Sequence, residues 1–176
     1  MDTKTRTEQI LVIMRVLAWI AFIGLTIKVG AILTSYAVSC VNPTAAKDLY
    51  RGLDFYKLSQ HNFWYYSQFV SFLVVYIGLK AYMIFLVIRS LSKVNLANPF
   101  TNEVARILER ISYTLLAIWI IAQLNNTHAS WLLKKTDMTL GDLATGEFLF
   151  MAGLVFIISQ VFKRGVEIQS ENELTV

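Results

Sequence analysis

The sequence is poor in cysteine, proline and charge, and each shortage excludes a class of protein. Cys40 is the single cysteine, so the chain has no pair for an intrachain disulfide and no cysteine cluster for a metal. The two prolines, Pro43 and Pro99, both lie between apolar segments and leave those segments unbroken. Charged residues make up 16% of the chain, against about 25% in a typical soluble domain. This composition argues against a soluble domain.

Catalytic motifs are also missing. The sequence has no phosphate-binding glycine loop, no His-Glu-x-x-His and no Gly-x-Ser-x-Gly. His61 and His128 are too few for a zinc site without further ligands nearby. The apolar segments carry no pair of carboxylates of the kind that a proton-coupled pump uses. We therefore predict that the protein is not an enzyme and has no metal or cofactor.

Apolar side chains are what the sequence has in excess. They make up 56% of only 176 residues, and a chain of this length leaves much of its surface exposed. A lipid bilayer is the natural solvent for that excess. The net charge of +4 does not indicate direct binding to nucleic acid, because the basic residues flank apolar runs as membrane anchors do. The polar N-terminus leads into a run too long for a signal peptide, so we read a retained first helix.

Four apolar segments are long enough to span a membrane, at about 20 residues for each crossing. They cover about residues 10–36, 63–88, 111–133 and 143–162, and we predict that the helices containing them cover about residues 10–36, 63–92, 101–133 and 143–170. Because the connections are short, we predict a single all-α integral membrane domain over residues 1–176, a four-transmembrane-helix antiparallel bundle. The connection 41–62 is longer than a turn needs, and its apolar pattern is compatible with a short interfacial helix.

Lysine and arginine placement predicts that both termini lie inside, in the cytoplasm. Nine basic residues then fall on the cytoplasmic side, namely Lys4, Arg6, Arg15, Arg89, Lys93, Arg106, Arg110, Lys163 and Arg164. Five fall outside, namely Lys47, Arg51, Lys57, Lys134 and Lys135. Aromatic residues gather around the first outer connection and indicate an interfacial belt, although they could instead line a ligand groove. They are Tyr50, Phe55, Tyr56, Phe63, Trp64, Tyr65 and Tyr66.

One informative stretch precedes the third segment and runs from Asn98 to Arg106. Pro99 forces Asn98 out of helical geometry. Thr101 then suits the N-cap, where its hydroxyl accepts a bond from a backbone N–H of the next turn, and Glu103 falls in the turn that the helix dipole makes favourable for a carboxylate. Two basic residues, Arg106 and Arg110, follow one turn apart on one side. A capped helix with basic interfacial anchors also accounts for this pattern.

The other informative stretch ends the fourth segment. The charges change sign along it, from Lys163 and Arg164 to Glu167, Glu171 and Glu173. Glu167 and Glu171 are four residues apart, so a helical tail presents both on one face. We predict that this acidic face docks on Arg106 and Arg110, as a contact worth little for each exposed pair.

Together the two stretches resemble a bacterial membrane family, that of domain of unknown function 2975 (YoaS-like proteins). The resemblance lies in Asn98-Pro-Phe-Thr-x-Glu-x-Ala-Arg, with Phe100 as its aromatic residue, in Val161-Phe-Lys-Arg-Gly-x-Glu and in the four-span layout. The family usually has Asn after the Glu and more arginines in the next turn, where this chain has Val104, Ile107 and Glu109. The resemblance implies a small helix-turn-helix regulator as partner and transfers no catalytic residue.

Polar residues inside the apolar segments form a second candidate site: Lys28, Gln68, Lys80, Asn125, His128 and Glu147. An ammonium within a span is costly and by default marks a functional site, although Lys80 and Lys28 can also snorkel to the headgroups. Several of these residues are expected towards the outer side, where they could line a small polar cavity. No pairing among them follows from the sequence.

We therefore hold two functional hypotheses for a multi-pass protein of the bacterial cytoplasmic (inner) membrane. The first is a regulator whose cytoplasmic face, from Asn98 to Arg110 and from Lys163 to Glu173, binds a small helix-turn-helix transcription factor. The second is a membrane binder or carrier of a small molecule, peptide or lipid in the polar intramembrane cavity. A structural subunit of a larger assembly and a homo-oligomer both stay open.

Overall fold

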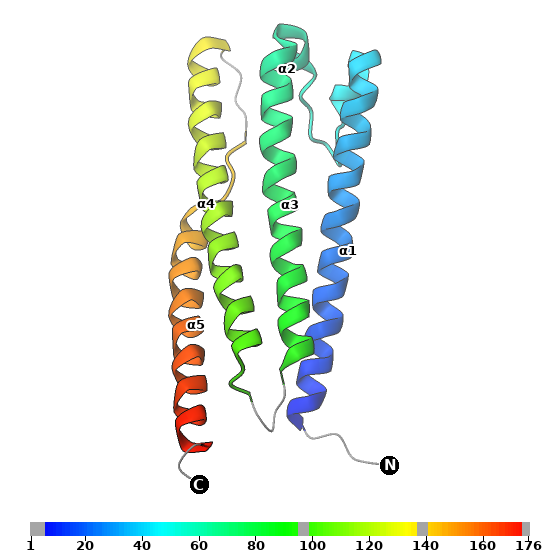
Figure 1. Ribbon diagram of the computed structural model, residues 1–176. Coiled ribbons are helices and arrows are strands. Elements are labelled where there is room, and N and C mark those ends of the chain that lie inside the picture. The colour runs from blue at the N-terminus through cyan, green and yellow to red at the C-terminus, as the bar shows by residue number, and fades with distance from the viewer. Residues whose placement is uncertain (1–5, 95–98, 137–140, 174–176) are drawn as a thin grey trace. The chain divides into compact units, whose positions relative to one another are not determined.

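The computed structural model describes residues 6–94, 99–136 and 141–173, and it has no strand in these ranges. Four long helices carry the fold (Figure 1), and their bounds are Arg6–Val41 for α1, Phe63–Lys93 for α3, Asn102–Thr136 for α4 and Gly146–Glu173 for α5. Each is long and apolar enough to cross a membrane. The all-α prediction with four spans is therefore confirmed. The helices run past the predicted bounds at most ends, because backbone hydrogen bonding continues beyond the apolar run.

The connection between α1 and α3 is folded, as its apolar pattern indicated. It contains a 3₁₀ helix at Pro43–Lys47 and the short helix α2 at Tyr56–His61. The Asn42 side chain caps the 3₁₀ helix by accepting from the Thr44 N–H at 3.1 Å. Ala46 and Leu58 are buried, so the connection packs through its apolar positions.

The chain divides into two compact units. Unit 1 comprises Met1–Phe22, Tyr82–Ala117 and Gly146–Val176, and unit 2 comprises Ile23–Ala81 and Ile118–Thr145. Helices α1, α3 and α4 contribute residues to both units, whereas α5 belongs to unit 1 and α2 to unit 2. The two candidate sites fall in different units and are described separately.

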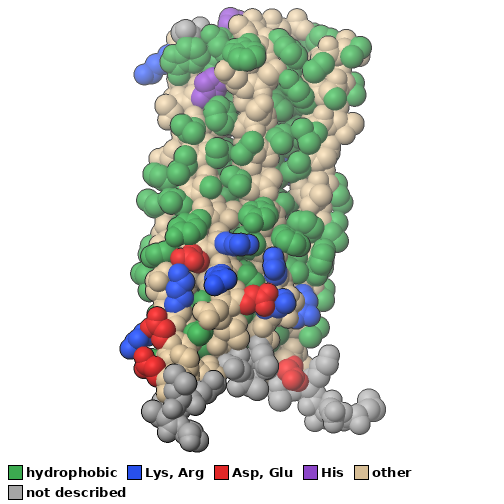
Figure 2. Space-filling model, in the orientation of Figure 1, with side chains coloured by type: hydrophobic (Ala, Val, Ile, Leu, Met, Phe, Trp, Pro, Cys, Tyr) green, Lys and Arg blue, Asp and Glu red, His purple; other side chains and the backbone are tan. Residues whose placement is uncertain are grey.

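Unit 1 is built around one face of α4. Ile107, Ile111 and Leu115 follow one another at four-residue spacing, so they form a single buried stripe. They pack with Leu86 of α3 and Ala152 of α5, which gives this unit a core drawn from three helices. Helix α1 joins through Arg15, whose guanidinium donates to the Leu91 carbonyl at 2.9 Å. Charged side chains gather in this unit around the start of α4 and the end of α5 (Figure 2).

Unit 2 is held together by hydroxyl groups as well as by apolar packing. Tyr36 of α1 donates to the Ser67 hydroxyl of α3 at 2.8 Å. The hydroxyls of Ser39 and Tyr66 lie 2.8 Å apart, and both residues are buried. The rings of Tyr36 and Tyr66 also contact each other, with centroids 5.5 Å apart. These contacts fix the α1–α3 pair through polar groups that are bonded to one another.

Residues 141–145, which precede α5, lie against α4 and α3 without forming a helix. Asn126 of α4 holds this segment at two atoms, accepting from the Leu143 N–H at 2.8 Å and donating to the Leu143 carbonyl at 2.9 Å. Tyr76 of α3 donates to the next carbonyl, that of Ala144, at 3.3 Å. Non-helical backbone needs such partners wherever water is absent. These two side chains therefore allow a non-helical segment to lie against the helices.

Candidate functional site

The start of α4 is capped as the sequence predicted. The Val104 N–H donates to the Thr101 hydroxyl at 3.3 Å, and the Ala105 N–H donates to the Thr101 carbonyl at 3.0 Å. Glu103 stands in the first turn and forms ion pairs with Lys93 at 3.3 Å and Arg89 at 4.0 Å. These pairs hold the end of α3 near the start of α4. Asn98, also predicted for this site, lies outside the described residues.

Phe100 joins the two sequence stretches to each other. Its ring meets the Phe162 ring of α5 edge to face, with centroids 5.3 Å apart. The same ring lies directly over Gly165, where a Cβ atom would come within 2.6 Å of the phenyl carbon Cδ1. Only a residue without a side chain leaves room for the ring. The Pro-Phe-Thr part of the first stretch, residues 99–101, and the Phe-Lys-Arg-Gly stretch therefore form one packed surface in unit 1.

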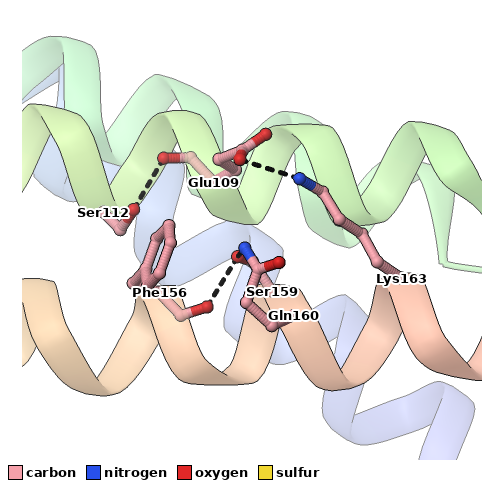
Figure 3. A network of polar contacts seen from close by, with 6 residues as sticks. All are labelled: Glu109, Ser112, Phe156, Ser159, Gln160 and Lys163. Atoms are coloured by element: carbon pink, nitrogen blue, oxygen red, sulfur yellow. Dashed lines mark hydrogen bonds and ion pairs between the residues drawn. The ribbon is translucent and has the colours of Figure 1, made fainter.

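A charged pocket of about 470 Å³ lies between α4 and α5. Its lining residues are Asn102, Ala105, Arg106, Glu109, Lys163, Val166, Glu167 and Ser170. The Lys163 ammonium donates to the Glu109 carboxylate at 2.8 Å across this pocket (Figure 3). Deeper along the same helices, Ser112 bonds the Glu109 carbonyl, and Ser159 bonds the Phe156 carbonyl and accepts from Gln160. The pocket is thus lined by both signs of charge.

The contact between α5 and α4 has the opposite polarity to the predicted one. We expected acidic residues of α5 to dock on Arg106 and Arg110, but the ion pair places the base on α5 and the acid on α4. Glu167 bonds Arg164 of its own helix at 2.6 Å. Arg106 and Glu167 still line the same pocket. The Glu173 side chain lies outside the described part of the structure, and Glu171 is exposed.

The polar residues predicted for an intramembrane site are distributed over several positions. The Lys28 ammonium lies 5.6 Å from the centre of the Tyr50 ring, and that of Lys80 lies 4.2 Å from the centre of the Tyr76 ring. Aromatic faces attract cations, so both lysines have a local partner. Glu147 belongs to unit 1, whereas the other five belong to unit 2. The structure brings two of the set, Gln68 and His128, into one groove.

That groove has a volume of about 480 Å³ and lies between α3 and α4 in unit 2. Trp64, Ser67, Gln68, Ser71, Phe72, Val75, Ile121, Leu124 and His128 line it. The imidazole of His128 is packed among aromatic rings, with the Trp131 centroid at 6.0 Å and the Phe72 centroid at 6.0 Å. Its Nδ1 is buried and has no hydrogen-bond partner within the described residues.

Asn125 is the second polar residue of α4 that lacks a partner. It is fully buried, and neither its amide nitrogen nor its oxygen has a hydrogen-bond partner among the residues that the structure describes. Such a group costs about 1–3 kcal/mol of desolvation. Asn126, next in sequence, is bonded to Leu143 through both its amide nitrogen and its oxygen. Two identical neighbours therefore have opposite roles.

Several functional contacts were not predicted from the sequence. Glu109 enters the sequence argument only as a departure from the family pattern, yet it holds the ion pair between α4 and α5. Asn126 belongs to a polar cluster in sequence, and nothing local assigns it to residues 141–145. Gly165 carried no distinguishing signal, because Gly24, Gly30, Gly78 and Gly153 also lie inside helices and have no atom within 4 Å of the corresponding Cβ position. As for metals, no three His, Cys, Asp or Glu side chains come together in residues 6–94, 99–136 and 141–173.

Four helices able to cross a membrane, with polar side chains bonded inside each unit, define a multi-pass integral membrane protein of the all-α class. The chain belongs to the family described as protein of unknown function (DUF2975), whose sequence model matches residues 46–176. This match confirms the predicted family, and it includes both of the informative stretches. Comparisons with curated proteins and with solved structures found no match.

Proposed function

We propose that this protein is a non-enzymatic regulator of the bacterial cytoplasmic membrane, which binds a small helix-turn-helix transcription factor at its charged end. By the charged end we mean the start of α4, from Pro99 to Arg110, and the end of α5, from Lys163 to Glu171. Both termini then lie in the cytoplasm, as the basic residues predict. The observation that carries the proposal is the packing of Phe100 on Gly165 and Phe162, which makes one surface of the two family stretches.

Charge explains how such a surface would act on a DNA-binding partner. Phosphate contacts supply much of the affinity of these proteins for DNA, so their DNA-binding faces are basic. Glu167 and Glu171 are exposed on α5 and can compete with phosphate for that face. Arg106 and Arg110 are also exposed and can meet acidic groups on the rest of the partner. Capture by the membrane protein would therefore withdraw the regulator from DNA.

The experiment is capture of the partner by the full chain, solubilised in detergent and immobilised. The added partner is a purified small helix-turn-helix protein of the kind that the family resemblance implies, tested at 50–500 mM salt as a titration of about one decade. The variant Glu167→Gln/Glu171→Gln removes the exposed acids of the charged end. Glu147→Gln is the matched control, because it neutralises an exposed acid at the opposite end of α5.

Support for the proposal is saturable capture that weakens about tenfold in Glu167→Gln/Glu171→Gln, weakens with salt and is unchanged in Glu147→Gln. The captured fraction should also lose its binding to a labelled operator fragment. Equal capture by all three proteins, or none by the parent chain, would count against the charged end as the binding surface. A ternary complex with DNA would contradict competition for the phosphate-binding face.

A second candidate function is the binding of a small molecule or lipid within unit 2. The groove between α3 and α4 favours it, because it places Gln68 and His128 beside apolar and aromatic side chains. Ligand sites are typically concave and apolar with a few polar groups that orient the ligand. In a membrane regulator such a groove would supply the signal. This candidate stands or fails independently of the partner at the charged end.

A further inference from the structure

The groove between α3 and α4 is amphiphilic along its length. Helices α3 and α4 run in opposite directions, and His128 lies beside Phe72 and Tyr65 of α3. The polar lining residues Ser67, Gln68 and His128 therefore share one end. Val75 and Ile121 lie at the other end, on α3 and α4 respectively. From Trp64 to Val75 the α3 lining covers eleven helical steps, or about 16 Å at 1.5 Å per residue.

Hydrogen-bond accounting shows which groups of the polar end are available. The Ser67 hydroxyl donates to the Phe63 carbonyl at 2.9 Å and accepts from Tyr36, and Ser71 donates to the Ser67 carbonyl at 2.7 Å. The half-buried Gln68 amide lines the groove, and the buried Nδ1 of His128 has no partner within the described residues. A buried polar group without a bond is unfavourable. A ligand in the groove can therefore bond the Gln68 amide, whereas the Nδ1 of His128 has almost no accessible surface and the histidine offers the ligand its ring.

The lining also limits the charge and shape of the ligand. Among the described residues, no lysine, arginine, aspartate or glutamate lines the groove, so a phosphate headgroup would find no counter-charge there. Trp64, Phe72 and the His128 ring border the polar end, and flat aromatic surfaces of this kind favour a planar partner. Val75, Ile121 and Leu124 continue as a purely aliphatic wall suited to a hydrocarbon chain.

From these observations we infer that the groove binds a neutral amphiphile with a flat carbonyl-bearing ring and an apolar tail, the chemistry of a membrane quinone. The ring lies between Trp64 and the His128 edge, and a ring carbonyl accepts a hydrogen bond from the Gln68 amide. The tail follows Val75 and Ile121 along the groove. This inference rests on the second candidate function and specifies its ligand; it includes binding only and no electron transfer.

Trp64 supplies the readout, because quinones quench indole fluorescence on contact. The full chain is placed in phosphatidylcholine nanodiscs and titrated with a benzoquinone that carries a ten-carbon chain. Trp64→Phe assigns the signal to the groove. Gln68→Leu/His128→Leu removes both polar groups, and Gln123→Leu on the exposed face of α4 is the matched control. Circular dichroism of each variant checks the helix content, and Gln68→Leu alone serves if the double variant unfolds.

The expected result is saturable quenching whose amplitude falls in Trp64→Phe, with the remainder arising from Trp131, whose ring stacks on His128. The dissociation constant should rise about tenfold in Gln68→Leu/His128→Leu, the loss of roughly one net hydrogen bond, and stay the same in Gln123→Leu. If decanol displaces the benzoquinone at equal concentrations, the assignment of a quinone is overturned and the groove is a site for lipid-like ligands. Linear quenching, equal in all the proteins, would show partition into the bilayer and would overturn both the ligand and the second candidate function.

Discussion

Among the glycines of the described residues, Gly165 is the one where an added methyl group would clash with a neighbouring side chain. A Cβ atom there would lie 2.6 Å from Cδ1 and 2.8 Å from Cγ of Phe100, closer than carbon atoms pack. Because Cγ lies on the Cβ–Cγ axis, turning the ring about χ2 cannot clear it, and a change of χ1 would move the ring away from Phe162. Gly153 of the same helix has no atom within 4 Å of the same Cβ position. The two glycines therefore differ in surroundings while sharing an element.

We predict that Gly165→Ala lowers the free energy of unfolding by about 1–3 kcal/mol, the usual cost of overpacking. Gly153→Ala should be neutral or stabilising by up to about 1 kcal/mol, because alanine favours helix more than glycine does. Chemical unfolding in detergent, followed by circular dichroism, measures both. Phe100→Ala should restore part of the loss in Gly165→Ala. Equal stability of the two alanine variants would contradict the packing described for the ring.

The adjacent pair Asn125 and Asn126 gives a second comparison at this scale. Asn126→Leu leaves the N–H and carbonyl of Leu143 without partners, at a cost of about 1–3 kcal/mol for each buried group. Asn125→Leu removes a buried amide that lacks a partner in the described residues, and we expect it to be neutral or stabilising. Hydrogen–deuterium exchange at residues 141–145 should rise only in Asn126→Leu. The same response in both variants would refute this division of roles.

The sequence predicted that Thr101 caps the start of α4, but it did not predict which groups the side chains of Asn125 and Asn126 contact. A proline before a threonine and a glutamate is a local pattern, so the N-cap of α4 could be predicted. The partner of Asn126 lies seventeen residues along the chain, and no local pattern encodes it. Asn125 and Asn126 are the same residue type and have the same helix propensity, so only tertiary packing distinguishes them.

At the scale of elements, α4 and α5 are joined by packing and by one ion pair. Ile107 and Ile111 pack with Ala152, and the Glu109–Lys163 pair lies at the edge of this apolar contact. The Glu109 side chain is 24% exposed and that of Lys163 is 37% exposed, so water screens the pair only in part. The Glu109–Lys163 ion pair therefore specifies which faces of α4 and α5 meet more than it stabilises their contact.

We predict that Glu109→Lys lowers stability by about 1–2 kcal/mol, because it puts two ammonium groups together at a partly buried position. Lys163→Glu should have a similar effect. The exchanged variant Glu109→Lys/Lys163→Glu should recover most of the loss, which a double-mutant cycle of unfolding energies measures. Arg164→Glu is the control, since Arg164 is more exposed and bonds within its own helix. Additive effects of the two single changes would rule out the direct pair.

The extents of the helices were largely predictable, because the 20-residue requirement of a bilayer is a strong constraint on sequence. What was missed at this scale is the non-helical segment 141–145 before α5, since α5 begins at Gly146 rather than at the predicted residue 143. The apolar run includes Leu143 and Ala144, but their backbone is bonded by Asn126 and Tyr76. Hydropathy counts those residues as helix because it does not detect side-chain partners for the backbone.

For the whole molecule, the predicted orientation can be tested with Cys40. This residue is exposed near the end of α1, so a cytoplasmic N-terminus places it outside the cell membrane. We predict that a membrane-impermeant maleimide labels Cys40 in intact spheroplasts. In a Cys40→Ser background, Ser170→Cys on α5 should react only after permeabilisation. The opposite labelling pattern would reverse the orientation and remove the charged end from the cytoplasm.

The candidate sites show a similar limit of sequence reasoning at this scale. The family stretches led to the charged end, but the Lys163–Glu109 ion pair between α5 and α4 was not predicted, because charge sign alone does not fix register. Of the intramembrane set, only Gln68 and His128 share a groove among the described residues, since the lysines lie on tyrosine rings. Cation–π contacts give no signal in hydropathy.

The seat of Phe100 on Gly165 has a consequence for the synthesis of the chain. Gly165 lies sixty-five residues after Phe100 in the chain. At roughly 5–20 residues synthesised per second, Phe100 is therefore made several seconds before Gly165. Throughout that interval the connection after α3 has no α5 surface to pack against. The contact can form only once residue 165 has been made, so it forms after the contacts between α3 and α4 in unit 1 have become possible.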